Sequence, residues 1–119
     1  MGARTNFEFK TDQGTMTLYS HWGGETKAQD LASALYKAEN RMSMGDTSYA
    51  LRIIIDQLTK DGRDSETGYG IFLGEGQGEE EYDPVTVDLI NKTVIDSSGT
   101  HSIFDYIMYH TVLTEQRLG

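Results

Sequence analysis

The sequence predicts an α+β fold: one domain with a mainly antiparallel sheet, in the element order ββααβββα, packed against two helices. Apolar residues alternate with polar ones near the start of the chain and again past residue 66, as in strands with one buried face. Between residues 27 and 58 they recur at helical spacing. A length of 119 residues suits a single core. We expect residues 1–5 to be an N-terminal remnant or disordered, and residues 6–119 to form the domain.

The first half contains a hairpin and two helices. Runs 6–10 and 15–20 are β-prone and flank the turn sequence Asp12-Gln13-Gly14. Thr26 and Gln29 match a capping box, which predicts a first helix over about residues 27–41. Asp46 is a favourable N-cap and Gly62 suits the position after a C-terminus, so a second helix lies between them, although three consecutive isoleucines favour a strand.

The second half alternates with period 2. Strands are expected at 67–73, 85–89 and 93–96, with a glycine-rich acidic stretch after the first and a tight turn at Asn91-Lys92 before the last. Ser102 and Asp105 form a cap that predicts a short C-terminal helix.

The acidity of the chain is concentrated in one block. The net charge is −9, and residues 61–88 hold nine acidic residues against Arg63 alone. A negative surface repels phosphate backbones, so direct nucleic-acid binding is disfavoured. The run Glu79-Glu80-Glu81 is interpreted either as a solvated loop or as a surface that meets a basic partner.

Several classes of protein are excluded or disfavoured. No apolar run approaches the roughly 18 residues of a membrane span, and the start lacks a signal-peptide pattern. The absence of cysteine excludes disulfides, thiolate nucleophiles and zinc ribbons. We therefore expect a cytoplasmic protein with no membrane partner.

Catalytic motifs are also absent. The chain has no G-x-S-x-G, P-loop or H-E-x-x-H sequence, and His101 and His110 lack the spacing of a metal pair. We expect no cofactor, no metal and no catalysis, leaving open an enzyme that uses His21 with acidic neighbours.

The segment Tyr19-Ser20-His21-Trp22-Gly23-Gly24 is the main candidate for a ligand rim, because the only tryptophan stands beside a histidine and two glycines before a helix. The alternative is that Trp22 packs over the core edge. Gly70, inside a predicted strand, indicates a bulge or a close backbone approach. Arg52 is expected either to bind phosphate or to pair with Asp56. The candidate ligand-binding residues are Tyr19, His21, Trp22, Gly23, Gly24, Arg41, Tyr49, Arg52, Glu66, Thr67 and Tyr69.

Four motifs resemble a family of small bacteriophage and prophage proteins. They are Leu18-Tyr19-Ser20-His21-Trp22-Gly23-Gly24, Thr47-Ser48-Tyr49-Ala50-Leu51-Arg52-Ile53-Ile54, Glu66-Thr67-Gly68-Tyr69-Gly70-Ile71 and Val85-Thr86-Val87-Asp88. The family patterns are Leu-Tyr-x-His-Trp-x-Gly, Ser-Tyr-x-x-Arg-x-Ile, Glu-Thr-Gly-Tyr-Gly-Ile and Val-x-Val-Asp, and the similarity covers residues 5–105. The resemblance implies a biological setting, which is action against host defence inside the host cell. It implies no mechanism.

Two functions fit these observations. The first is a non-enzymatic protein that binds and sequesters a small anionic nucleotide, such as a cyclic nucleotide immune signal, with Trp22 or Tyr69 stacking a base and Arg41 or Arg52 on phosphate. The second is an acidic inhibitor or DNA mimic, comparable to an anti-CRISPR protein, that binds a basic host defence protein. Self-association is left open.

Overall fold

The computed structural model describes residues 4–21, 23–24, 26–74 and 83–118. Its strands are β1 (Thr5–Thr11), β2 (Gly14–Ser20), β3 (Tyr69–Leu73), β4 (Val85–Asp88), β5 (Thr93–Asp96) and β6 (Gly99–Ser102). Its helices are α1 (Lys27–Lys37), α2 (Glu39–Ser43), α3 (Thr47–Thr59), the 3-10 turn η1 (Lys60–Gly62) and α4 (Ile103–Leu118). β1 begins at Thr5, which is fully buried.

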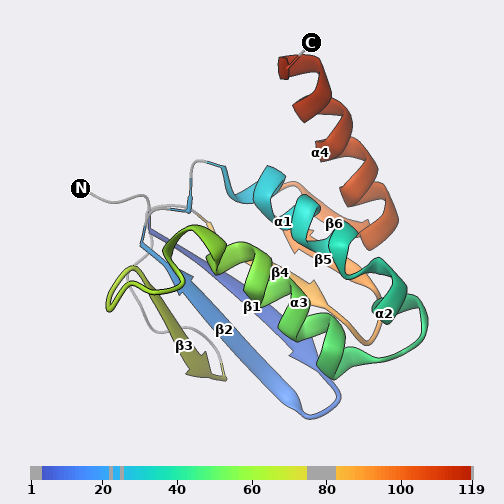
Figure 1. The fold of residues 1–119 in the computed structure, drawn as a ribbon. Helices are drawn as coiled ribbons and strands as arrows, with labels where there is room; N and C mark the ends of the chain where they lie inside the picture. Colours follow the sequence, from blue (N-terminus) through green and yellow to red (C-terminus); the bar gives the residue numbers. More distant parts are fainter. Residues whose placement is uncertain (1–3, 22, 25, 75–82, 119) are drawn as a thin grey trace.

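The described strands form one mixed sheet in the order β3-β2-β1-β4-β5-β6 (Figure 1). β1 and β4 are parallel, and the other four neighbouring pairs are antiparallel. The predicted α+β class with a mainly antiparallel sheet is therefore confirmed. β3 and β6 lie at the two edges.

Helices α1 and α3 cover one face of the sheet, as predicted (Figure 1). The alternation in the first hairpin turns Phe7, Phe9 and Leu18 toward these helices, where each is at most 2% exposed. Leu35 of α1 and Ile54 of α3 are fully buried against them. Burying each of these side chains stabilises the fold by about 1.5–3 kcal/mol.

α4 is longer than the predicted C-terminal helix. Its first turns bury Tyr106 and Ile107 near α1, and the helix then projects beyond the sheet (Figure 1). Asp105 N–H donates to Ser102 Oγ at 3.0 Å, so the predicted cap is present. Within the described ranges, no helix has both the length and the apolar character needed to cross a lipid bilayer.

The first helical segment differs from the prediction. It is broken at Ala38, which separates α1 from α2 and whose N–H is shared between the carbonyls of Ala34 and Leu35. The capping box is also wrong: Thr26 occupies the N-cap, but its hydroxyl donates to Asp30 Oδ2 at 2.7 Å and caps no backbone N–H.

The turn between β4 and β5 is longer than the expected two residues. Register pairs Asp88 with Thr93, leaving residues 89–92 as the connection. Asp88 Oδ1 accepts the N–H groups of Ile90 and Asn91, both at 3.0 Å, which closes the wider turn. Strand β6 was not predicted, because its sequence Gly-Thr-His-Ser lacks apolar alternation. Its backbone is held in an extended conformation by pairing with β5.

Candidate functional site

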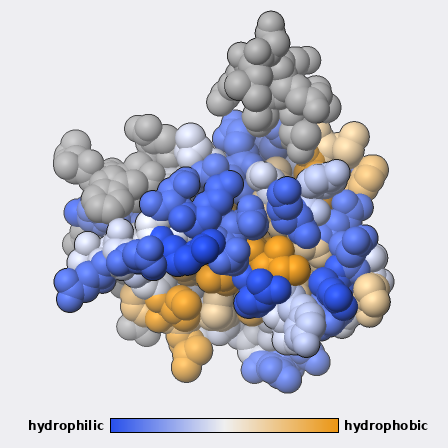
Figure 2. Space-filling model, viewed as in Figure 1, coloured by the Kyte–Doolittle hydropathy of each residue, from blue (hydrophilic) through white to orange (hydrophobic). Residues whose placement is uncertain are grey.

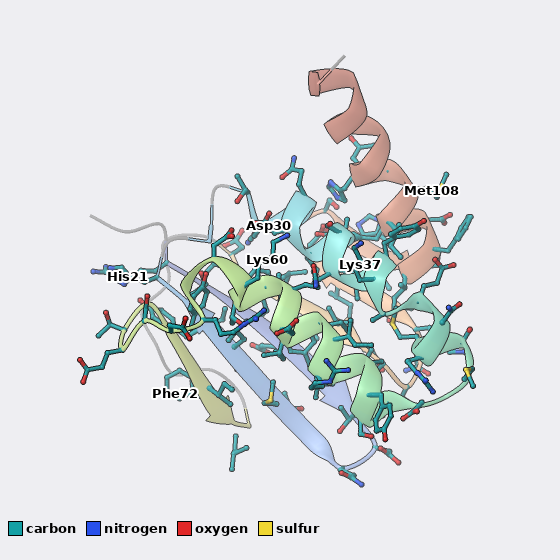
Figure 3. All side chains as sticks on the ribbon, in the orientation of Figure 1. His21, Asp30, Lys37, Lys60, Phe72 and Met108 are labelled. Carbon is teal, nitrogen blue, oxygen red and sulfur yellow. The ribbon has the colours of Figure 1, made fainter. Side chains whose placement is uncertain are left out.

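The two predicted aromatic segments lie side by side at the end of β2. The His21 N–H donates to the Gly68 carbonyl at 2.9 Å, and Tyr19 Oη lies 2.9 Å from His21 Nδ1. Register pairs Ser20 with Tyr69 and Tyr19 with Gly70. Figure 3 shows His21 at this side of the molecule. Trp22 lies outside the described residues.

Tyr19 and Tyr69 nevertheless face opposite sides of the sheet. Side chains alternate along a strand, and the buried Leu18 faces the helices, so Ser20 and its partner Tyr69 do too. Tyr19, paired with Gly70, faces the side that α1 and α3 leave uncovered. The two aromatic residues therefore cannot line one pocket on one face.

A small pocket of about 200 Å³ lies on the helical side, between the end of β2, α1 and the end of α3. Ser20, Gly23 and Tyr69 line it, with Lys60 beside Asp30 and Asp61 (Figure 3 labels Asp30 and Lys60). Burial, with smaller contributions from Asp61 and Asp30, raises the pKa of Tyr69, so its phenol stays protonated. At about 200 Å³ this pocket is smaller than the usual range of about 300–1,000 Å³ for small-molecule sites.

The glycines near Tyr69 have a different role from the predicted one. A Cβ at Gly62 would lie 2.8 Å from Tyr69 Cε2, so Gly62 is explained by ring packing and is not a left-handed helix end. Gly70 has no heavy atom within 4 Å of a built Cβ, and the β2–β3 ladder runs through it without a bulge. The expected bulge or close approach at Gly70 is therefore wrong. Glu66 and Thr67, just before β3, are exposed.

Arg41 and Tyr49 form a separate surface pair. The Arg41 Cζ atom lies 5.4 Å from the centre of the Tyr49 ring, and Nη1 lies 3.5 Å from Asp46 Oδ2. Asp46 occupies the predicted N-cap of α3 but makes no side-chain cap. The first N–H groups of α3 thus lack a side-chain acceptor from the N-cap.

A groove of about 730 Å³ lies between α3 and the β1–β2 hairpin. Its apolar lining comes from Met16, Leu51 and Ile55, and α3 begins at one end of it. The polar lining residues comprise hydroxyl, acidic and arginine side chains, among them Thr11, Asp12, Asp46, Thr47, Ser48, Arg52, Asp56, Thr59 and Arg63.

Arg52 is placed in this groove and not in the pocket beside Tyr69. Its predicted alternative, an ion pair with Asp56, is not formed, and Asp56 Oδ1 pairs instead with Arg63 Nη2 at 2.8 Å. Among the described residues, no ion pair or hydrogen bond engages the exposed Arg52 side chain. Figure 2 shows the mixed polar and apolar character of the face that carries α3.

Sequence reasoning missed Met16, Leu51, Ile55 and Arg63 as groove residues. The first three read as ordinary core positions, and only the folded chain brings the hairpin under α3. Arg63 did carry a signal, since it is the single base in an acidic block seven positions after Asp56.

Ser98, His101 and Asp96 form a second polar cluster that sequence reasoning missed. Ser98 Oγ and Asp96 Oδ1 lie 2.9 and 3.2 Å from the same atom, His101 Nε2. A nucleophilic serine needs the carboxylate on the opposite imidazole nitrogen, so this is not a catalytic triad. Burial raises the pKa of Asp96, but the bonds from Ser98 and His101 outweigh it and hold that pKa below its ordinary value. The cluster closes the β5–β6 turn.

No known protein family, curated protein sequence or solved structure is significantly similar to this chain. The resemblance of its four motifs to small phage proteins therefore stays a prediction. A functional assignment depends on the chemistry of the site residues.

Proposed function

We propose that this protein binds and sequesters a small anionic nucleotide, without chemical change, in the groove between α3 and the β1–β2 hairpin. The observation that carries the proposal is Arg52, which lines the groove and has no ionic partner among the described residues. A guanidinium grips two phosphate oxygens at once, which gives both charge and orientation.

The rest of the groove supplies what such a ligand needs. A volume of about 730 Å³ lies within the usual range of about 300–1,000 Å³ for small-molecule sites. Met16, Leu51 and Ile55 offer an apolar surface to a base. Thr47 and Ser48 bring hydroxyls together with the N-terminal N–H groups of α3, where anions are favoured.

The carboxylates of the groove narrow the ligand class. The negative charges of Asp12, Asp46 and Asp56 disfavour the binding of a highly charged anion. A cyclic nucleotide, whose phosphodiesters each carry one negative charge, suits the groove better than a nucleoside triphosphate. The resemblance to phage proteins makes a cyclic nucleotide signal of host defence the physiological candidate, with the host cytoplasm as the place of action.

Calorimetric titration with cyclic mono-, di- and trinucleotides tests this proposal. We expect saturable binding by at least one of them, a raised melting temperature, and recovery of the ligand intact after denaturation. Recovery of a cleaved product would show an enzyme instead. If no member of the panel binds or changes the melting temperature, nucleotide capture is wrong.

Variants locate the site. Arg52→Lys keeps the charge but loses the planar fork, so we expect affinity to fall by about tenfold, equal to 1.4 kcal/mol. Lys37→Gln, which removes a cation from exposed α1 surface, is the matched control and should bind like the parent. Equal affinity of Arg52→Lys and the parent would exclude this groove.

A second candidate function is inhibition of a basic host defence protein. The described part of the acidic block places exposed Asp61, Asp64 and Glu66 just before the edge strand β3. On that strand Ile71 and Leu73 are 58% and 91% exposed, and apolar colour marks this edge in Figure 2. An apolar edge rimmed by acids suits a partner with basic residues around an apolar strand.

The acidic run tests the second function, although Glu79, Glu80 and Glu81 lie outside the described residues. Changing all three to Gln should slow association with a basic partner and flatten its salt dependence. A pull-down from host extract compares the variant with the parent. Retention of the partner by the variant at physiological salt would exclude charge-based inhibition.

A further inference from the structure

A third cavity, of about 400 Å³, lies at the β6 edge of the sheet between the β5–β6 hairpin and α4. Its walls are aromatic rings. The centres of Tyr106 and His110 are 4.4 Å apart, and Tyr109 stands at 88° to His110 with centres 5.0 Å apart. His101 lies 6.2 Å from Tyr106 on the hairpin side. Figure 3 marks Met108 on the same helix, far from His21 and the β3 edge.

The charges around these rings are negative. Asp96 and Asp105 line the cavity, and no lysine or arginine lines it among the residues whose side chains the structure describes. Burial lowers the pKa of His110, against a smaller opposing effect of Asp96, so this ring is neutral at pH 7. Burial, together with Asp96, raises the pKa of Tyr106, so its phenol is neutral as well.

Tyr106 also brings a polar group to the cavity. The residue is 4% exposed and lines the cavity, yet its hydroxyl makes no hydrogen bond to any described residue. Although the residue is buried, its hydroxyl oxygen is not one of the buried side-chain atoms without a partner, so it is open to a ligand that donates or accepts a hydrogen bond. The cavity is the side from which a ligand reaches it.

The donor set does not suit a metal ion. No group of three or more His, Cys, Asp or Glu side chains in the described part of the chain could hold one. His101 Nε2 is already engaged by Asp96 and Ser98. Two carboxylates exclude an anionic ligand from the same space. Electron-rich ring faces beside carboxylates instead favour a soft organic cation.

We propose that this cavity binds an organic ammonium cation, with its alkylated nitrogen against the rings of Tyr106, Tyr109 and His110 and its charge facing Asp96 and Asp105. The site is separate from the α3 groove and does not depend on the function proposed for it. The cation is either a free small molecule or the methylated lysine side chain of a peptide, since both present the same group.

Titration of the full chain followed by two-dimensional NMR tests the site. The probes are choline, a peptide with one trimethyllysine, and 3,3-dimethyl-1-butanol, which replaces the choline nitrogen by carbon and is uncharged. We expect saturable chemical-shift changes centred on residues 96–110. The neutral analogue should bind at least tenfold more weakly than choline. Tighter binding of the peptide than of choline would assign the cation to a partner chain, and the reverse to a free molecule.

Five single-residue variants separate recognition from general surface effects. Asp105→Asn and Tyr109→Leu should each weaken cation binding at least fivefold, whereas Tyr109→Phe, which keeps the ring, should retain it. Asp64→Asn and Tyr36→Leu change an exposed acid and an exposed tyrosine elsewhere and should leave affinity unchanged. The proposal is overturned if neither cation shifts these resonances at up to about 20 mM, if the neutral analogue binds equally, or if the controls weaken binding as much as the cavity variants.

Discussion

Arg63 and Asp56 form an ion pair, Nη2 to Oδ1 at 2.8 Å, on the rim of the α3 groove. This pair takes up the carboxylate that helical spacing offers to Arg52, four positions earlier on α3. The side chains are 56% and 41% exposed, so the pair adds at most about 1 kcal/mol to stability. Its larger effect is on which guanidinium remains available to a ligand.

Removing Asp56 should therefore raise affinity for an anion. Asp56→Asn deletes one of the three groove carboxylates and releases Arg63, so we expect nucleotide binding to tighten by about three- to fivefold. Calorimetric titration with the nucleotide that binds the parent measures this. Weaker binding by Asp56→Asn would show that the carboxylate contacts the ligand directly.

Replacing Arg63 should have the opposite result. In Arg63→Ala, Asp56 loses its partner. It lies four positions after Arg52 on α3, a spacing at which an ion pair can form. We expect anion affinity to fall although residue 63 need not touch the ligand. The double variant Arg63→Ala, Asp56→Asn should recover the affinity, and a failure to recover it would indicate that Arg63 binds the ligand itself.

Asp88 stabilises the turn between β4 and β5. Its carboxylate accepts two backbone N–H groups and the Asn91 Nδ2–H group at 2.9 Å. Asp88→Ala should lower the free energy of unfolding by about 1 kcal/mol, measured by urea denaturation at pH 7. Asp88→Asn, which keeps one acceptor oxygen, should lose less.

The same carboxylate makes stability depend on acid pH. The N–H of Asn91 is the largest cause that holds the pKa of Asp88 below its ordinary value. A depressed carboxyl pKa contributes stability above the unfolded pKa, near 3.8, and loses it as the pH falls through the folded pKa. The difference in unfolding free energy between the parent and Asp88→Ala should therefore shrink in that range. A difference that stays constant down to pH 2 would contradict this role.

His110 should destabilise the fold in mild acid. Burial lowers its pKa from 6.5, so the folded state resists protonation. Its contribution to stability is complete above pH 6.5 and is lost as the pH falls toward the folded pKa. NMR titration of the imidazole should show the lowered pKa, and His110→Gln should reduce the pH dependence of unfolding between pH 7 and 5. An imidazole that titrates at or above 6.5 would refute this.

Two glycine substitutions separate packing from backbone freedom. Gly62→Ala places a methyl 2.8 Å from Tyr69 Cε2 and should destabilise by about 1–2 kcal/mol. Gly70→Ala meets no atom within 4 Å and should be neutral or slightly stabilising. Thermal denaturation compares them, with Tyr69→Leu added to Gly62→Ala as the rescue. A loss at Gly70 equal to that at Gly62 would disprove the distinction.

The alternation of Phe7, Phe9 and Leu18, and the helical spacing around Leu35 and Ile54, were enough to predict the fold class and the two covering helices. These patterns report which side of an element is apolar, and that property is local to the element. The break at Ala38 was not predictable in the same way. Ala38 and Met42 continue the helical spacing of the buried residues, so no local pattern marks the break.

The candidate site, too, has features that residue type alone predicted and features that only packing decided. Arg52 could be chosen from the sequence because its residue type suits phosphate, whereas the contact between the end of β2 and the residues before β3 is made by the fold. That Tyr19 and Tyr69 face opposite sides of the sheet depends on strand register, which is set when β2 pairs with β3.

By itself, the sequence determined the α+β class, the inward faces of the elements and the concentration of acidic charge, because each follows from the order of residue types along the chain. Only the tertiary structure decided which charges share a cavity. Asp56 lies four positions from Arg52 but pairs with Arg63, and His101 meets Tyr106 and His110 only where the β5–β6 hairpin approaches α4. Such choices depend on distances between side chains of different elements, which spacing along one element does not fix.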